Sequence, residues 1–415
     1  MLNPELAELY ARRDEPAAAL PSLDRIAPLP VEAPDAAAIP LGEAALCRGE
    51  VAVLLVAGGQ GTRLGFDKPK GVYKVGPVSG ASLFQIHAEK VLALRRRYQA
   101  SVPFLIMTSP LTHAETVADF DKNKNFGLDG DVHFFQQGTM PALDLATGEP
   151  LLEAEGRPFL SPNGHGGTLT ALADSGLLAT MKARGVKHIF YFQVDNPLVK
   201  IAEPAFLGAH IAAMSEVSSK VVYKEQPEEK VGVLALIDGR CGIIEYSDLP
   251  AELATARAAD GTLLHRAGNP AIHLFSVGFL EKVTDGADRL QYHIARKKVP
   301  YYDVATKSVI APTTENALKF ELFIFDALPL AVRWLAVEAK RDEEFAPLKN
   351  ATGPDSPETV RRLMIDRAAR WLEACGCEVP NDAPVEISPL YALDETELAA
   401  KITHDFQVRG PMYLH

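Results

Sequence analysis

The chain has 415 residues, of which 47% are hydrophobic and 23% charged, a composition typical of a soluble globular protein with two or three domains. Its formal net charge of −12 argues against broad nucleic-acid binding, which usually needs a basic surface. The negative net charge does not exclude phosphate ligands. Exposed charges more than roughly 10 Å from a site are largely screened, so the groups next to the ligand determine whether it binds. No stretch approaches the roughly 20 apolar residues of a membrane-spanning helix, so we expect no membrane partner.

The cysteines indicate a reducing compartment. There are four of them, and Cys375-Gly-Cys377 lacks the spacing of zinc ligands. So few cysteines in a chain of this length do not suggest a disulfide framework. The first residues show no basic stretch followed by an apolar run, which would mark a secretory signal. We therefore expect a cytoplasmic protein.

The sequence divides into three regions. Residues 1–45 are rich in Ala and Pro and predict a short helix followed by extended chain. In residues 46–350 helical patterns alternate with apolar strand-like runs, at 51–57, 103–109, 131–137, 188–194, 219–223 and 231–238. This alternation predicts an α/β fold whose mostly parallel, twisted sheet is covered by helices on both faces. Residues 351–415 are expected to form a small C-terminal α/β domain.

A glycine-rich turn follows the first strand, at the edge where parallel α/β sheets bind their ligands. It comprises Gly58, Gly59, Gln60, Gly61 and Thr62. Glycine lets backbone N–H groups come close to a ligand, and amides in a turn before a helix form a natural anion site. The glycines alone are equally compatible with a tight turn that binds nothing.

Two cations behind the turn favour a phosphate ligand. The dinucleotide pattern G-x-G-x-x-G fails because its sixth position is Leu64, and no glycine-lysine pair has the offset of the Walker pattern. The turn is followed instead by Arg63 and Lys70. The planar guanidinium group of Arg63 suits phosphate oxygens, and Pro69 restricts the backbone before Lys70 and would help to orient its side chain. The broken dinucleotide pattern weighs against a rival class, the NAD-dependent dehydrogenases.

The stretch AGGQGTRLGFDKPKG resembles the signature of the eukaryotic-type UDP-sugar pyrophosphorylases, which include UDP-N-acetylglucosamine and UDP-glucose pyrophosphorylases. The similarity extends over about residues 45–410. It implies that residues 46–350 form a Rossmann-like nucleotidyltransferase domain of the GT-A type. It also implies that the backbone amides of the glycine turn hold a nucleoside triphosphate.

Two further segments resemble the uridine side of this family. In FFQQGTMPAL the match implies that Gln136 or Gln137 bonds the uracil edge, and we favour Gln136; an amide can donate and accept at once. In SPNGHGGTLTAL the match implies that Gly164 meets the base and that His165 points at the sugar. Without the resemblance, a surface glutamine and an ordinary loop histidine would be the simpler interpretations.

The resemblance also implies a sugar pocket, lined by Gly232, Glu245, Tyr246 and Asn269. Pro270 departs from the isoleucine usual in this motif. His165 is typical of the glucose and broad-sugar branches, since the N-acetylglucosamine branch usually has Asn there. Most other motifs side with the N-acetylglucosamine branch. We therefore favour N-acetylglucosamine 1-phosphate slightly, with glucose 1-phosphate close behind.

The segment YFQVDNPLVK places Asp195 at the end of an apolar strand. An isolated D-N-P is usually a turn, but the family match implies that this aspartate holds Mg²⁺. That ion prefers one or two carboxylates together with phosphate oxygens and water, and no second protein ligand is indicated. The resemblance further implies that Lys319 contacts the sugar phosphate. Lys298 and Lys349 could also reach phosphate, but for each a solvated surface lysine is the better interpretation.

The implied reaction converts UTP and a hexose 1-phosphate into a UDP-sugar and pyrophosphate. The attacking phosphate is already an anion at neutral pH, so we assign no general base. Arg63, Lys70, Lys319 and Mg²⁺ would supply positioning and electrostatic stabilisation. The alternative is a UDP-sugar sensor without catalysis, which would not need these cations together with Asp195. The oligomeric state is left open.

Overall fold

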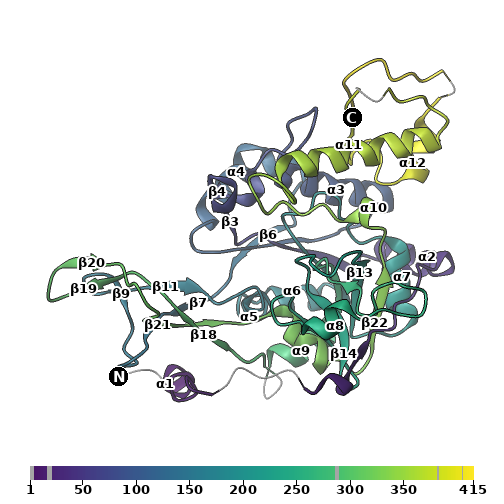
Figure 1. Cartoon of the computed structure of the whole chain (residues 1–415). Helices are drawn as coiled ribbons and strands as arrows, with labels where there is room; N and C mark the ends of the chain where they lie inside the picture. The colour runs from purple at the N-terminus through teal and green to yellow at the C-terminus, as the bar shows by residue number, and fades with distance from the viewer. Residues whose placement is uncertain (1–3, 16–20, 286–288, 381–382, 404) are drawn as a thin grey trace.

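The computed structural model describes residues 4–15, 21–285, 289–380, 383–403 and 405–415 (Figure 1). At its centre the described residues form an eleven-stranded sheet. Nine of the strands follow the order β1-β14-β16-β13-β17-β12-β2-β5-β6, while β15 pairs with β14 and β22 pairs with β13. The strands are β1 (Ile26–Pro28), β2 (Val51–Val56), β5 (Phe104–Thr108), β6 (Val132–Gln136), β12 (His188–Gln193), β13 (Val217–Tyr223), β14 (Val233–Ile237), β15 (Arg240–Ile244), β16 (Ala267–Gly268), β17 (His273–Ser276) and β22 (Trp334–Glu338).

The sheet is mixed, which corrects the expectation of a mostly parallel sheet. One half is parallel, because β12, β2, β5 and β6 all run in the same direction. In the other half β17 runs antiparallel to β12 and β13, and β14 and β15 form a hairpin. Asp238 and Gly239 close this hairpin with φ of 53° and 74°, the two positive values of a type I′ turn.

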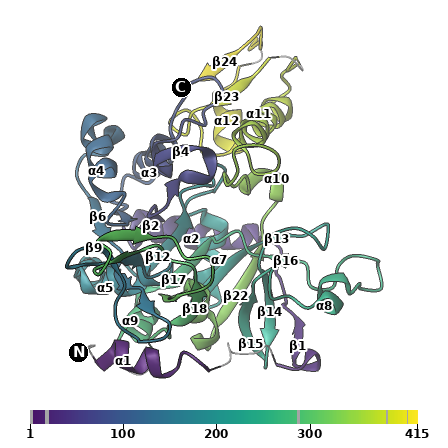
Figure 2. The same ribbon diagram turned by 60° about the vertical axis from the view of Figure 1, so that its left-hand side comes forward.

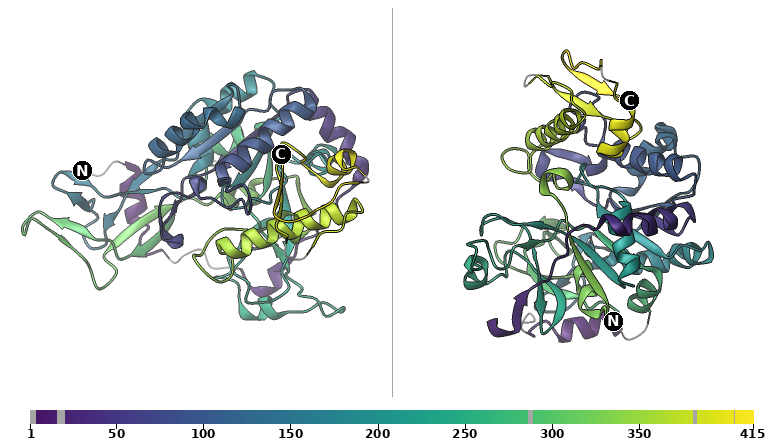
Figure 3. Two further views of the ribbon diagram at one scale, coloured as in Figure 1. Left: turned by 90° about the horizontal axis from the view of Figure 1, so that it is seen from above. Right: turned by 90° about the vertical axis from the view of Figure 1, so that its right-hand side faces the viewer.

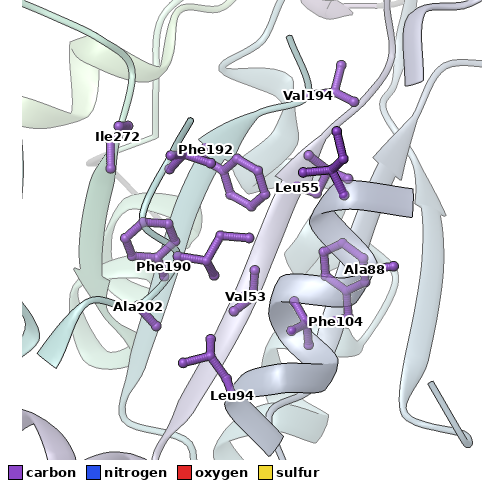
Figure 4. Close-up of a cluster of buried hydrophobic side chains, with 14 of the residues drawn as sticks. Val53, Leu55, Ala88, Leu94, Phe104, Phe190, Phe192, Val194, Ala202 and Ile272 are labelled. Carbon is purple, nitrogen blue, oxygen red and sulfur yellow. The ribbon is translucent and has the colours of Figure 1, made fainter. Parts of the chain in front are cut away.

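The strand β2 is buried on both faces, as its unbroken apolar run predicts. Val53 and Leu55 pack in one core cluster with residues of α3 (Leu83–Tyr98), as Figure 4 shows. Ala52 and Leu54 lie in a second cluster with residues of α5 (Gly167–Asp174), α6 (Leu177–Ala183) and α9 (Val277–Thr284). Ser82 caps α3 by accepting a hydrogen bond from the Gln85 N–H.

Several smaller elements surround the central sheet. The remaining helices are α1 (Pro4–Ala11), α2 (Ile39–Cys47), α4 (His113–Lys122), α7 (Pro204–Ala212), α8 (Ala251–Thr255) and α10 (Arg341–Glu344). An arm of short strands extends to one side in Figure 1. It contains β7 (Thr139–Pro141), β8 (Leu143–Asp144), β9 (Leu152–Ala154), β10 (Arg157–Pro158), β11 (Leu160–Pro162), β18 (His293–Lys297), β19 (Tyr301–Asp303), β20 (Ser308–Ile310) and β21 (Ala317–Glu321). Leu6 and Leu9 of α1 pack in a cluster with residues of this arm.

The C-terminal unit lies at the end of the molecule opposite the N-terminus (Figure 3). It consists of α11 (Pro357–Ala374), β23 (Val385–Ile387), α12 (Glu395–Lys401) and β24 (Met412–Leu414), with a core of its own around Trp371 and Val385. Val360 and Met364, near the start of α11, belong instead to the central core. No helix in the described part of the chain is long and apolar enough to cross a membrane.

Buried histidines make the stability of this fold dependent on pH, and His210 of α7 is one of them. Its Nδ1 lies 2.7 Å from the Ser218 hydroxyl, and burial lowers its pKa to about 3. The unfolded chain takes up a proton near pH 6.5 whereas the folded chain does not, so stability falls as the pH drops below 6.5.

We therefore predict that His210→Gln flattens the pH dependence of unfolding. Between pH 7 and pH 5 the wild type should lose about 2 kcal/mol more of its unfolding free energy than the variant, because the variant lacks the titrating group. Urea unfolding at both pH values measures the difference. Parallel losses in the two proteins would contradict a depressed pKa for His210.

Candidate functional site

The site lies where β2 and β12 end side by side, beneath β4 (Phe66–Pro69) in Figure 2. Because these two strands are parallel, their carboxyl ends bring the glycine turn and Asp195 to the same edge of the sheet. A cavity of about 240 Å³ opens there, lined by Gln60, Gly61, Thr62, Arg63, Leu64, Lys70, Asp195 and Lys349. Of the residues singled out in the sequence, the cavity brings together Gln60, Gly61, Thr62, Arg63, Lys70 and Asp195.

The glycine turn folds as a small hairpin. Its strands β3 (Gln60–Gly61) and β4 (Phe66–Pro69) enclose a short 3-10 turn over Thr62–Leu64. The Lys70 N–H donates to the Gly59 carbonyl at 3.1 Å, which draws Lys70 back to the start of the turn. A Cβ at Gly61 would lie 2.8 Å from the Phe66 carbonyl oxygen, so a larger residue there would force the hairpin open.

The charges in the cavity are unbalanced. The Lys70 Nζ lies 3.3 Å from Asp195 Oδ2. Arg63 and Lys349 form no ion pair with any other described residue, yet both line the cavity. Three cations therefore face one carboxylate, and this excess of positive charge in a chain of net charge −12 suits a polyanion.

Lys349 lines the cavity, whereas we had expected a solvated surface lysine at this position. The backbone N–H of Leu348 donates to the Asp195 carbonyl at 2.9 Å, and this bond brings the next residue to the cavity. No glycine turn or strand end marks Lys349 in the sequence, and its neighbours in the cavity lie more than 150 residues away along the chain. Only the tertiary contact reveals it.

Asp195 is the carboxylate that could hold a metal ion. It is 8% exposed and lies two residues beyond β12. Among the described residues no group of three or more His, Cys, Asp or Glu side chains is placed to bind a metal. A single carboxylate beside three cations would suit Mg²⁺, an ion that takes one or two carboxylates together with phosphate oxygens and water.

The amide of Gln137 lies between the two glycine turns. It is 7% exposed, and its Nε2 donates to the Gly164 carbonyl at 3.1 Å. A Cβ built on Gly58 would lie 2.5 Å from its Oε1. Gln136, at the end of β6, is exposed, and its side chain forms no hydrogen bond with another described residue. The structure thus brings Gln137, rather than Gln136, next to the predicted nucleotide-binding glycines.

The second glycine turn is pressed against the segment after β21. Gly164 has φ of 83°, and a Cβ there would lie 2.4 Å from the Leu322 carbonyl oxygen, so glycine is required. His165 accepts a hydrogen bond from the Ile324 N–H at its Nδ1, 3.2 Å away, and packs against the rings of Phe323 and Phe325. Burial lowers the pKa of His165 to about 4, so the ring is neutral at pH 7.

Three of the predicted sugar residues lie together around β14. The Asn269 N–H donates to the Gly232 carbonyl at 2.9 Å, and a Cβ on Gly232 would lie 3.1 Å from Glu245 Oε1. Burial raises the pKa of Glu245, while the charge of Lys349 opposes this shift and thereby links the group electrostatically to the cavity. Tyr246 is 49% exposed and has no ring contact with another described residue.

Lys319 lies outside the cavity. It sits on β21, opposite Ala295 of β18, in the strand arm. The side chain is half-buried and pairs with no other described residue. The structure therefore does not bring Lys319 together with Arg63, Lys70 and Lys349, and its predicted contact with the sugar phosphate stays a prediction.

Comparison with known proteins agrees with this geometry. The family model described as UTP–glucose-1-phosphate uridylyltransferase matches residues 24–399. The chain is 41% identical over 358 residues to the UDP-N-acetylglucosamine pyrophosphorylase of Saccharomyces cerevisiae, a match that covers 84% of this chain and 75% of the yeast protein. It is 39% identical over 373 residues to UDP-N-acetylglucosamine diphosphorylase 2 of Arabidopsis thaliana, covering 84% and 72% of the two chains.

A solved structure gives the same result. The fold matches the UDP-N-acetylglucosamine pyrophosphorylase of Trypanosoma brucei, crystallised with an inhibitor, with a TM-score of 0.81 and 28% identity over 91% of this chain and 83% of that one. The family match spans most of the chain, and the cavity residues lie inside it. The chain therefore belongs to the UTP–glucose-1-phosphate uridylyltransferase family of UDP-sugar pyrophosphorylases, and it is a nucleotidyltransferase.

Proposed function

We propose that the protein makes UDP-N-acetylglucosamine and pyrophosphate from UTP and N-acetylglucosamine 1-phosphate, with Mg²⁺ and in a GT-A type domain. A phosphate oxygen of the sugar 1-phosphate attacks the α-phosphorus of UTP, and the bond from that phosphorus to the β-phosphate bridging oxygen breaks. The observation that supports this most strongly is the convergence of Arg63, Lys70 and Lys349 on Asp195. Several relatives named as UDP-N-acetylglucosamine pyrophosphorylases favour this sugar.

The cavity would act mainly by electrostatics. Two anions must come together in this reaction, so fixed positive groups that face the phosphates lower the barrier without a general base. Arg63 would stabilise the departing pyrophosphate and Lys70 would neutralise the α-phosphate. Lys349 is the third cation at this point, and Lys319 remains a proposed contact for the sugar phosphate.

Asp195 would hold the metal ion. When bound, Mg²⁺ would supply charge to phosphate oxygens and restrict their geometry. The Lys70 Nζ lies 3.3 Å from Asp195 Oδ2. Triphosphate binding would give Lys70 a new anionic partner and leave the carboxylate available to the ion. The Lys70 ammonium and the Asp195 carboxylate would therefore each have a partner of opposite charge before and after the triphosphate binds.

We predict that Lys70→Ala and Asp195→Ala each lower kcat by on the order of 10²–10³ while the proteins stay folded, because each removes one preorganised charge. Pyrophosphate release from UTP and N-acetylglucosamine 1-phosphate measures turnover. Lys68→Ala is the matched control, because Lys68 is exposed and lies outside the cavity. Near wild-type turnover of either cavity variant would refute its role, and an inactive wild type that still binds UDP-sugars would support the sensor alternative.

Recognition of the base is proposed to rest on the amide beside the two glycine turns. The position of Gln137 favours it over Gln136, since its neighbours Gly58 and Gly164 are the proposed nucleotide contacts. An amide can match the donor and acceptor groups of uracil.

We predict that Gln137→Ala reduces the ratio of kcat/KM for UTP over CTP by roughly 10-fold or more, because a uracil group loses its partner. Gln136→Ala is the matched control, with an expected change of less than about 3-fold. If Gln136→Ala relaxed the discrimination and Gln137→Ala did not, the uracil contact would belong to Gln136.

Glucose 1-phosphate is the second candidate substrate, because His165 stands where the N-acetylglucosamine branch usually has Asn. The neutral imidazole ring packs against the rings of Phe323 and Phe325. His165 would therefore limit the space for the sugar rather than bind it through a charge.

We predict that His165→Asn raises the ratio of kcat/KM for N-acetylglucosamine 1-phosphate over glucose 1-phosphate by roughly 10-fold, the scale of one altered group in a substrate pocket. The smaller amide makes room for an N-acetyl group. An assay across the glucose, N-acetylglucosamine, galactose and N-acetylgalactosamine 1-phosphates gives the wild-type ratio and then the variant's. An unchanged ratio would place His165 outside the sugar pocket, and a shift toward glucose would contradict the steric explanation.

A further inference from the structure

Asn196, the residue after Asp195, is buried and fully engaged with backbone groups. It is 4% exposed. Its Nδ2 donates to the Glu344 carbonyl at 2.6 Å. Its Oδ1 accepts from the Ala346 N–H at 3.0 Å and from the Leu198 N–H at 3.2 Å. A single amide therefore joins the loop that carries Asp195 to a distant stretch of chain.

That stretch, residues 344–349, ends on Lys349. It forms three hydrogen bonds with loop 194–199 among the described residues: the two through Asn196, and the bond from the Leu348 N–H to the Asp195 carbonyl. At its other end the Glu344 carboxylate pairs with the buried Lys220. Lys349 itself donates its backbone N–H to the Asp355 carbonyl at 2.8 Å, and the three bonds to loop 194–199 fix the stretch that carries it relative to Asp195.

Loop 194–199 itself is held from its other side. The buried Lys90 Nζ donates to the Pro197 carbonyl at 2.6 Å and to the Val199 carbonyl at 2.7 Å. The His87 Nε2 lies 2.9 Å from the Val194 carbonyl. These contacts do not involve Asn196, so its loss should leave the loop in place and release mainly residues 344–349.

We propose that Asn196 is a positioning residue, which acts on the reaction by setting the distance between Lys349 and Asp195. The proposal rests on the proposed function of this cavity. A cation displaced by about 1 Å stabilises a developing charge far less well, so loosening the segment should reduce turnover more than binding. Lys349 would be the group through which Asn196 acts.

The first test is Asn196→Ala, assayed for pyrophosphate release with Mg²⁺-UTP and N-acetylglucosamine 1-phosphate. We expect kcat to fall at least 10-fold while KM for UTP changes less than 3-fold. Asn316→Ala is the matched control: Asn316 also bonds backbone groups at both ends of its amide, to the N–H and carbonyl of Val299, but lies in the strand arm. Its kcat should stay within 2-fold of the wild type.

A double-mutant cycle decides whether Asn196 acts through Lys349. In a Lys349→Ala background, Asn196→Ala should lower kcat by less than 3-fold further, because no cation remains to be placed. Losses that multiply in the double variant, or a single variant with unchanged kcat, would overturn the proposal. If the wild type itself releases no pyrophosphate with any sugar 1-phosphate, the proposed function fails first and this inference falls with it.

Should Asn196→Ala unfold in a thermal melt, Arg367→Lys provides the same test. The Arg367 guanidinium donates to the Leu198 carbonyl at 3.1 Å and to the Glu343 carbonyl at 3.4 Å, and so bridges the same two stretches from α11. Lysine keeps the positive charge but lacks the planar guanidinium group with its several N–H donors. We expect turnover to fall at least 3-fold in the wild-type background and to stay unchanged in the Lys349→Ala background. A loss of turnover that persists in that background would overturn the proposal.

Discussion

The ion pair between Lys70 and Asp195 joins two segments that lie 125 residues apart in the chain. It forms because β2 and β12 are adjacent and parallel, so the turn after one strand faces the residues that follow the other. Burying a carboxylate and an ammonium group costs desolvation energy unless each compensates the other. In the Lys70–Asp195 pair each group therefore compensates the charge of the other.

The surplus positive charge around this pair is the basis of the ligand choice that we propose for the cavity. Arg63 comes from the glycine hairpin and Lys349 from a segment near the C-terminal unit, and neither forms an ion pair with another described residue. A polyanion with a divalent ion can satisfy both, whereas a neutral ligand cannot. The same surplus disfavours a dinucleotide-binding dehydrogenase site, which relies on backbone amides more than on clustered cations.

The sequence predicted those parts of the site that local patterns encode. The turn 58–62, Arg63, Lys70 and Asp195 each follow a strand whose apolar run is visible in the sequence, so their convergence could be anticipated. Lys349 could not be, because its position depends on a backbone bond from Leu348 to a residue more than 150 positions away.

The mixed sheet and the placement of Gln137 also could not be predicted from local sequence patterns. An unbroken apolar run indicates a buried strand but not its direction, so β17 was open to either orientation. The Asp238-Gly239 turn was a local signal for the β14–β15 hairpin that the strand runs alone did not reveal. Gln136 and Gln137 are neighbours, and a one-residue shift changes which one faces the glycines.

We propose that the rim between the glycine hairpin and Asp195 holds a triphosphate with its metal ion. The decisive experiment is a crystal of the protein soaked with UTP and Mg²⁺, without a sugar phosphate. We expect density for the triphosphate against Arg63, Lys70 and Lys349, and for the ion beside Asp195. An empty rim with the nucleotide bound elsewhere would contradict it.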